Sequence, residues 1–456
     1  MNSANPLVSM AIFALGVGLS KAVSLLMLPF VTAHLSAEQY GWLDVLVTSS
    51  NGLSLLCMLA LPDLLLRLSA KSSMEQAWVI YQSLQRLAIK LSLIWLLLGQ
   101  GVLLLWSPEA LVDLQLLFAS LALSPLLALP LCWLRLNNAS KHFVCVVVYQ
   151  AVAQACGTLW VLKAGLGVTG MMLVGLLVSM SSLALCRLAM GKGLSATRSL
   201  RLARNDHLYL LCMTATGLSS FALGGAERLF IAQYGLAELA GYAVAAQFSL
   251  GMALLFEPFV LWWFARRQKV AEANPARAGR INLVGCFYLL SLCLLMSLLV
   301  PWFVRQFLPP AYHHALTFLP WLLLVGALRL GANLLGLGGV MRSQGRWQFA
   351  ASLVLACVGV LAFSLLIPIW GAQGAIAALV LVHSLRLVSF VLISQHLFPI
   401  VYPRSLSLLL LGMLGLLVLV AIEPLMLIVA GAGFFVLGLG FAITYRKQPT
   451  LVSQGV

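Results

Sequence analysis

Apolar runs long enough to cross a lipid bilayer recur from one end of the chain to the other. Each run holds about 20 residues with few charges, which is the length that a membrane-spanning helix needs. Short polar turns separate the runs and leave no stretch for a soluble domain. The pattern predicts an all-α polytopic membrane protein with about 14 transmembrane helices. The expected spans are residues 7–31, 40–66, 88–106, 111–134, 143–162, 169–188, 208–233, 240–265, 281–304, 316–341, 348–369, 372–395, 405–422 and 424–444.

A two-helix pattern near the amino terminus returns about 200 residues later. The turn HLSAEQYGW at 34–42 matches the turn YGLAELAGY at 234–242, with alanine, glutamate, glycine and an aromatic residue at equivalent positions. Arg67 and Arg267 follow one helix later at the same offset. This constant offset predicts two six-helix bundles related by an internal repeat. The expected domains are an amino-terminal bundle at 1–190, a cytoplasmic linker at 191–207, a carboxy-terminal bundle at 208–396, and an appended helix pair with a cytoplasmic tail at 397–456.

The composition agrees with a membrane protein. Hydrophobic residues fill 62% of the 456 positions and charged residues only 9%, which is too little polar surface for a soluble protein of this size. The first run has no basic residue ahead of it and exceeds the apolar core of a signal peptide, so we expect a retained helix. The nine cysteines lie in or beside apolar runs without a CxxC motif, so we expect neither a metal site nor a cofactor.

The net charge of +15 is explained by membrane topology. With a cytoplasmic amino terminus, almost every basic residue outside the spans falls on the cytoplasmic side, and the opposite side receives only Lys163 and Arg305. The positive-inside rule therefore predicts a multi-pass membrane protein with both termini in the cytoplasm. No nucleic-acid partner is expected.

Four basic residues fall inside predicted spans: Lys21, Arg228, Arg329 and Arg386. A charged side chain at the bilayer centre costs roughly 2.5 to 3.5 kcal/mol, so each of them needs a physical reason. If the two bundles face each other, these side chains line one positively charged cavity that suits an anionic cargo. The alternative is that each cation forms a buried ion pair that fixes the packing of the helices.

The carboxylates available for such ion pairs are Asp44, Asp63, Glu227 and Glu257. Glu227 is followed directly by Arg228, and adjacent residues on a helix point about 100° apart, so these two cannot simply face one another. Asp44, Glu227 and Glu257 are also candidate sites for a coupling proton or sodium ion.

Four segments carry a resemblance to a known superfamily: YGWLDVL at 40–46, LALPDLLLRLSA at 59–70, AERLFIAQYGLAELAGYAVAAQFS at 226–249 and GAQGAIAALVLVHSLR at 371–386. In these segments the chain resembles the bacterial polysaccharide flippases of the multidrug/oligosaccharidyl-lipid/polysaccharide exporter superfamily. Such proteins often carry an acidic residue and an arginine in the seventh helix. Here the pair is Glu227 and Arg228, with glutamate in place of the more familiar aspartate.

The resemblance implies two six-helix bundles around a V-shaped cavity that works by alternating access. It also implies a cargo of oligosaccharide linked to undecaprenyl diphosphate, whose pyrophosphate would meet the four buried cations. We therefore expect a flippase of the bacterial inner membrane that moves a lipid-linked repeat unit to the outer leaflet for the synthesis of a surface polysaccharide, such as O-antigen or an exopolysaccharide. It would make and break no covalent bond. Membrane lipids and other polysaccharide-assembly proteins are the expected partners.

Two other functions compete with this expectation. The first is an ion-coupled antiporter of drugs or cations from the same superfamily, for which acidic residues should dominate the cavity. The second is a membrane polymerase or ligase for glycans. That enzyme would need more polar surface outside the membrane than outward loops of roughly a dozen residues can supply.

Overall fold

A computed structural model describes residues 18, 22–70, 72–103, 111–190, 202–343, 345–423 and 427–447. Lys21 and most of the first predicted span lie outside these residues. In the part of the chain that is described, all regular structure is helical, which confirms the all-α prediction. The chain divides into two compact units, one made of Met1–Phe221 with Gly235–Leu239, and the other of Ala222–Tyr234 with Ala240–Val456.

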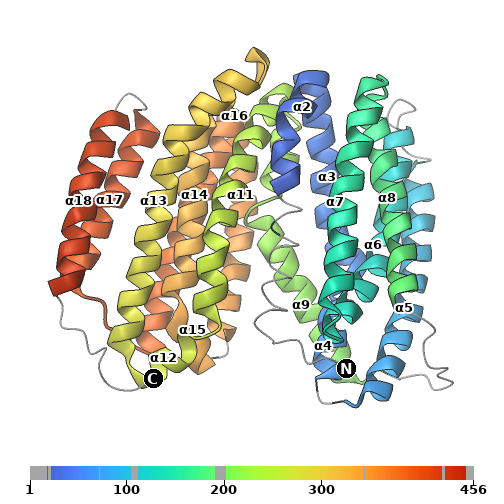
Figure 1. The fold of residues 1–456 in the computed structure, drawn as a ribbon, viewed down its shortest axis with the longest axis horizontal. Coiled ribbons are helices and arrows are strands. Elements are labelled where there is room, and N and C mark those ends of the chain that lie inside the picture. Colours follow the sequence, from blue (N-terminus) through green and yellow to red (C-terminus); the bar gives the residue numbers. More distant parts are fainter. Residues whose placement is uncertain are drawn as a thin grey trace. The chain divides into compact units, whose positions relative to one another are not determined.

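The first unit is built around α6, which packs against α3, α5 and α8 (Figure 1). α7 pairs with α8, and α4 packs against α5 and α6. The helices of this unit are α2 (Leu28–His34), α3 (Ala37–Met58), α4 (Leu61–Ser69), α5 (Met74–Leu103), α6 (Leu111–Leu136), α7 (Ser140–Lys163), α8 (Gly167–Met190) and α9 (Arg204–Ala222).

The second unit is built around α14, which packs against α13, α16 and α17. The last two helices, α17 and α18, pair with each other and contact α13. The elements of this unit are α10 (Glu227–Ile231), α11 (Leu236–Phe264), α12 (Arg267–Ala273), α13 (Pro275–Phe307), the short 3-10 helix η2 (Pro310–Tyr312), α14 (Ala315–Leu335), α15 (Leu337–Ser343), α16 (Arg346–Leu397), α17 (Arg404–Ile422) and α18 (Leu427–Lys447).

Eight helices of the described residues are long and apolar enough to cross a membrane. The bent pair of α3 and α4, which meet at 42°, adds a ninth span. Large apolar side chains such as Leu173, Leu361 and Leu408 are exposed along these helices, as expected for surfaces that contact lipid. The chain is therefore a multi-pass membrane protein.

Several predicted spans are broken within the bilayer. α3 and α4 are separated by Leu59 and Ala60, both with positive φ, directly before Pro62. The seventh span is interrupted at residues 223–226, between α9 and α10. The tenth is interrupted at Gly336, between α14 and α15. Hydropathy predicts each of these as one continuous run, because apolar composition alone does not reveal a local break. Pro62 is a sequence signal for a bend near the first of them.

The turn between the eleventh and twelfth spans is made by Gly371. Its φ of 56° and ψ of −137° divide α16 into two helical segments. These backbone angles are accessible to glycine and strained for any residue with a Cβ. Three residues later, Gly374 lies so close to the Leu366 carbonyl that a Cβ would collide with it. The reversal of the chain thus depends on two glycines that the sequence places at the predicted turn.

The two repeated turns have similar contacts in the structure. Trp42 donates its indole N–H to Asp113 Oδ2 at 2.9 Å, and Tyr242 donates its hydroxyl to Glu227 Oε1 at 3.0 Å. In each turn the glycine before the aromatic residue lies directly against another part of the same unit. Matched positions therefore carry matched interactions, as expected if the turns descend from a duplication.

We expect Gly371→Ala to lower the free energy of unfolding by about 1–3 kcal/mol, because alanine cannot adopt these backbone angles without strain. Thermal unfolding of the purified protein in detergent would measure the loss. Gly415→Ala is the matched control, since Gly415 lies inside α17 with open space around its Cα. Equal stability of the two variants would show that the turn tolerates a side chain.

Candidate functional site

A cluster of polar side chains lies between α14 and α16 in the second unit. Arg329 and Asn333 are one helical turn apart on α14, and His383 and Arg386 are three residues apart on α16. These spacings put each pair on one face of its helix. The two helices pack along their length, so the two polar faces meet.

Arg386 is held by groups that leave its charge uncompensated. Its Nη2 donates to Asn333 Oδ1 at 3.3 Å, and its guanidinium carbon lies 4.9 Å from the centre of the Phe390 ring. Its Nε is buried and has no hydrogen-bond partner among the described residues. An amide oxygen and an aromatic face position the cation without neutralising it.

Arg329 lies close to the break between α9 and α10. A Cβ on Gly224 would be 3.4 Å from Arg329 Nη1, so this glycine leaves room for the guanidinium group. Arg329 interacts electrostatically with Glu227 and with Arg386. The carboxylate that acts on Arg329 is Glu227, from the start of α10.

Glu227 begins the short helix α10 and is 3% exposed. The Tyr242 hydroxyl, from α11, donates to its Oε1. A carboxylate at the start of a helix is also favoured by the backbone N–H groups there. Arg228 follows on the same helix and is half-buried. The carboxylate of Glu227 acts on the charge of Arg329.

His383 connects α16 to the broken helix. Its Nε2 donates to the Leu223 carbonyl at 2.8 Å, and the side chain is 1% exposed. Leu223 follows the last residue of α9, where carbonyl groups have lost their partners within the helix. The imidazole supplies the missing donor and positions the break beside the two arginines.

Arg267 extends the cluster from α12. Its Nη1 donates to the Asn333 carbonyl oxygen at 3.1 Å, and its guanidinium carbon lies 3.7 Å from the centre of the Phe264 ring. Burial lowers the pKa of Arg267 to about 10. Asn333 therefore binds two arginines, one through its main chain and one through its side chain.

The structure brings together only some of the predicted site residues. Arg329, Arg386 and Glu227 lie in one cluster. Lys21 lies outside the described residues, so its place in a shared cavity stays a prediction. Asp44 is buried in α3 of the first unit, and Glu257 is exposed on α11.

Sequence reasoning missed three members of the cluster. Arg267 was assigned to a cytoplasmic loop, although it was one of the residues that marked the repeat. Asn333 and His383 are uncharged, so hydropathy and charge do not mark them as site residues within an apolar run. Their spacing was the available signal, because Asn333 lies four residues after Arg329 and His383 three before Arg386.

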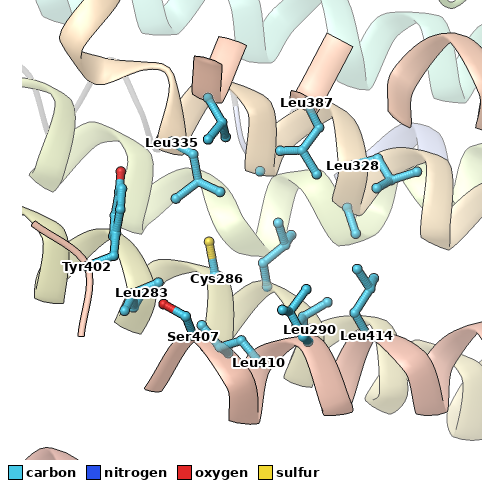
Figure 2. A pocket seen from close by; sticks show the side chains of 15 residues that line it. Leu283, Cys286, Leu290, Leu328, Leu335, Leu387, Tyr402, Ser407, Leu410 and Leu414 are labelled. Carbon is cyan, nitrogen blue, oxygen red and sulfur yellow. The ribbon is translucent and has the colours of Figure 1, made fainter. Parts of the chain in front are cut away.

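An apolar groove of about 260 Å³ lies beside this cluster in the second unit. Figure 2 shows leucine side chains from α13, α14, α16 and α17 around it, including Leu290, Leu328, Leu387 and Leu414. Polar atoms come from Cys286, Ser407 and Tyr402 among the lining residues, and no lining residue is charged. The groove can hold a hydrocarbon chain but offers nothing to bind an ion.

The α14 helix presents the cations and the groove on different faces. Leu328, Gly331 and Leu335 line the groove. At 100° per residue, Arg329 and Asn333 point to the other side of the helix. One helix therefore separates a positively charged surface from an apolar one.

The same arrangement of helices occurs in solved membrane transporters. A structure of the lipid II flippase MurJ in an inward closed conformation superposes with a TM-score of 0.69, covering 96% of this chain and 99% of that one at 14% sequence identity. This chain has the MurJ fold. The MATE multidrug transporter DinF-BH superposes with a TM-score of 0.54, covering 87% of this chain and 97% of that one at 14% identity.

Another transporter of this fold is more distant than MurJ. The Vibrio cholerae MATE transporter VcmN superposes with a TM-score of 0.52 at 14% identity, covering 86% of this chain and 95% of that one. No protein-family model and no curated protein sequence matches this chain. The likeness to MurJ and to the MATE transporters establishes the fold, and the cargo has to be argued from the site.

We expect Tyr242→Phe to destabilise the protein by about 1.5–3 kcal/mol, because a buried carboxylate loses a hydrogen bond to its charged form. The readout is thermal unfolding of the purified protein at neutral pH. Tyr288→Phe serves as the control, since its hydroxyl donates to the Leu255 carbonyl at an exposed position. A loss in Tyr242→Phe no larger than in the control would mean that Glu227 does not rely on this hydroxyl.

Proposed function

We propose that this protein is a flippase for a lipid-linked anionic saccharide, which it moves from the cytoplasmic to the outer leaflet of the inner membrane. The cargo class is an oligosaccharide carried on undecaprenyl diphosphate and used to build a surface polysaccharide. The observation that carries the proposal is the pair Arg329 and Arg386, which lie close enough to repel each other, with the buried Nε of Arg386 lacking a hydrogen-bond partner among the described residues.

The charge balance of the cluster favours an anion. Among the described residues, Arg267, Arg329 and Arg386 contribute three cations, and the carboxylate of Glu227 acts on Arg329. Guanidinium groups present several donors in a plane, which suits the oxygens of a phosphate or diphosphate. The arginine cluster would repel a cationic drug.

The apolar groove suits the rest of such a cargo. A prenyl chain gains about 0.8 kcal/mol for each CH₂ group removed from water, whereas a diphosphate cannot enter hydrocarbon without a polar environment. The second unit offers both kinds of surface on α14. An amphiphile with an anionic head and an apolar tail matches this pairing of surfaces better than a uniformly polar solute does.

Ion coupling would fall to Glu227 among the three candidate carboxylates. Its charge interacts with Arg329, so its protonation would change the net charge that the cargo meets. Asp44 belongs to the other unit, and Glu257 is exposed on α11. A proton or sodium gradient could therefore act on cargo binding through one carboxylate.

An ion-coupled antiporter is the second candidate, because the MATE transporters share this fold. Its supporting feature is Glu227, a buried carboxylate held by Tyr242. Binding of a cationic dye such as ethidium by the purified protein, abolished by Glu227→Gln, would favour the antiporter over the flippase.

We expect Arg329→Gln and Arg386→Gln each to slow translocation of the lipid-linked oligosaccharide at least tenfold. Each loses a charge-assisted interaction of about 1.5–3 kcal/mol with the diphosphate, and about 1.4 kcal/mol corresponds to a factor of ten. The measurement is transfer of a labelled lipid-linked oligosaccharide between leaflets of proteoliposomes.

Arg305→Gln is the matched control, because Arg305 is exposed in the last turn of α13 and should leave the rate unchanged. Wild-type rates in both cluster variants would assign the two arginines to helix packing and remove the basis of the proposal. Thermal unfolding of each variant separates slow transport from poor folding.

We expect Gly331→Leu to reduce translocation of a cargo with a long prenyl chain several-fold, because its side chain would project into the groove toward Leu387. Binding of inorganic pyrophosphate should stay unchanged, since the cation cluster lies on the other face of α14. Gly415→Leu, in open space on α17, controls for added volume elsewhere. Equal rates in both variants would show that the groove does not hold the chain.

A further inference from the structure

A polar groove in the first unit has no role in the proposed function so far. It lies between α7 and α8 and has a volume of about 380 Å³. Gln150 and Gln154 from α7 and Ser179 from α8 line it, together with small and apolar residues. None of the lining residues carries a charge, so this groove differs chemically from both the arginine cluster and the apolar groove of the second unit.

The groove is turned away from the lipid-facing side of the two helices. On α7, Val152 and Cys156 are exposed and apolar, and at 100° per residue they point away from Gln150 and Gln154. On α8, Leu173 and Leu177 form an equivalent exposed stripe opposite the groove. The polar side chains of the groove and the exposed apolar side chains therefore lie on different sides of the two helices.

The polar residues lie deep within their helices. Gln150 is roughly 15 Å from the start of α7 and roughly 20 Å from its end, at a rise of 1.5 Å per residue. An amide or hydroxyl at this depth costs several kcal/mol unless it finds a hydrogen-bond partner. A polar ligand or water must satisfy these groups when they are not satisfied within the protein.

The hydrogen bonds of the groove are only partly made within the protein. Gln154 Nε2 donates to Thr158 Oγ1 at 3.4 Å, which leaves the amide oxygen as an acceptor. Ser179 Oγ donates to the Gly175 carbonyl at 2.8 Å and keeps its own lone pairs. The Gln150 amide has no hydrogen-bond partner among the described residues, so it offers two donors and an acceptor.

We propose that this groove binds a neutral saccharide unit. A sugar hydroxyl is both a donor and an acceptor, and a side-chain amide can bind two neighbouring hydroxyls at once. The absence of charge makes the groove a poor site for a phosphate or a cation. The inference rests on the proposed function and deepens it, since it assigns the glycan part of the cargo to residues of α7 and α8.

The test compares two probes with the full-length protein in lipid nanodiscs. One probe is undecaprenyl diphosphate, and the other is undecaprenyl diphosphate that carries a neutral disaccharide. The wild type should bind the glycosylated probe about tenfold more tightly, which corresponds to one or two hydrogen bonds. Gln150→Leu and Gln154→Leu should lose this preference while they keep the affinity for the bare diphosphate.

Gln115→Leu is the matched control, because Gln115 is exposed on α6 of the same unit and should keep the preference. Ser179→Ala provides a variant of minimal size change, for which a partial loss is expected. Equal affinity of the wild type for both probes, or a preference that survives in both glutamine variants, would overturn the saccharide site and leave the anionic cargo in place. Binding of neither probe by the wild type would overturn the proposed function itself.

Discussion

The placement of two neighbouring arginines, Arg329 and Arg386, inside the helices of the second unit is the constraint on which this unit depends. A charge inside a membrane protein has to be neutralised or surrounded by oriented polar groups. Asn333 and the Phe390 ring hold Arg386, and the field of Glu227 acts on Arg329. These contacts fix where the charges lie and do not cancel them. A packing role would be satisfied by tight ion pairs, whereas a cluster with excess positive charge is suited to a ligand that supplies the missing negative charge.

The breaks in the helices pose a similar problem, because they also place polar groups in an apolar environment. Each break frees main-chain groups that a bilayer cannot satisfy, and at the breaks near Leu223 and Gly336 polar side chains of α16 reach these groups. His383 donates to the Leu223 carbonyl, and Gln348 donates to the Gly336 carbonyl at 2.5 Å. Ser394 accepts from the Gly338 N–H at 2.8 Å. One helix thus holds the irregular segments of two others, and one of these segments lies against Arg329. A movement at that break would change the surroundings of the cation at the same time.

The hydropathy pattern was sufficient to predict the fold class. The gap between two apolar runs was sufficient to place the turn at Gly371, because both features can be recognised within a short stretch of sequence. The break at Leu59 and Ala60 was not predictable in this way, since neither residue favours a positive φ. The cluster was predictable in part. Arg329 and Arg386 were conspicuous as charges in apolar runs, but His383 was not. Its role depends on the Leu223 carbonyl, 160 residues away in sequence, and no local pattern records such a contact.

The fold cannot decide between a lipid flippase and a multidrug transporter, because solved examples of both share it with this chain. The choice has to come from the chemistry that the fold presents. On α14, Leu328 and Leu335 face an apolar groove while Arg329 and Asn333 face the cation cluster. A drug cation would use neither the excess positive charge nor, beside it, a surface for a hydrocarbon chain. An anionic amphiphile uses both, so the sign of the charge and its place next to an apolar groove favour the lipid-linked cargo.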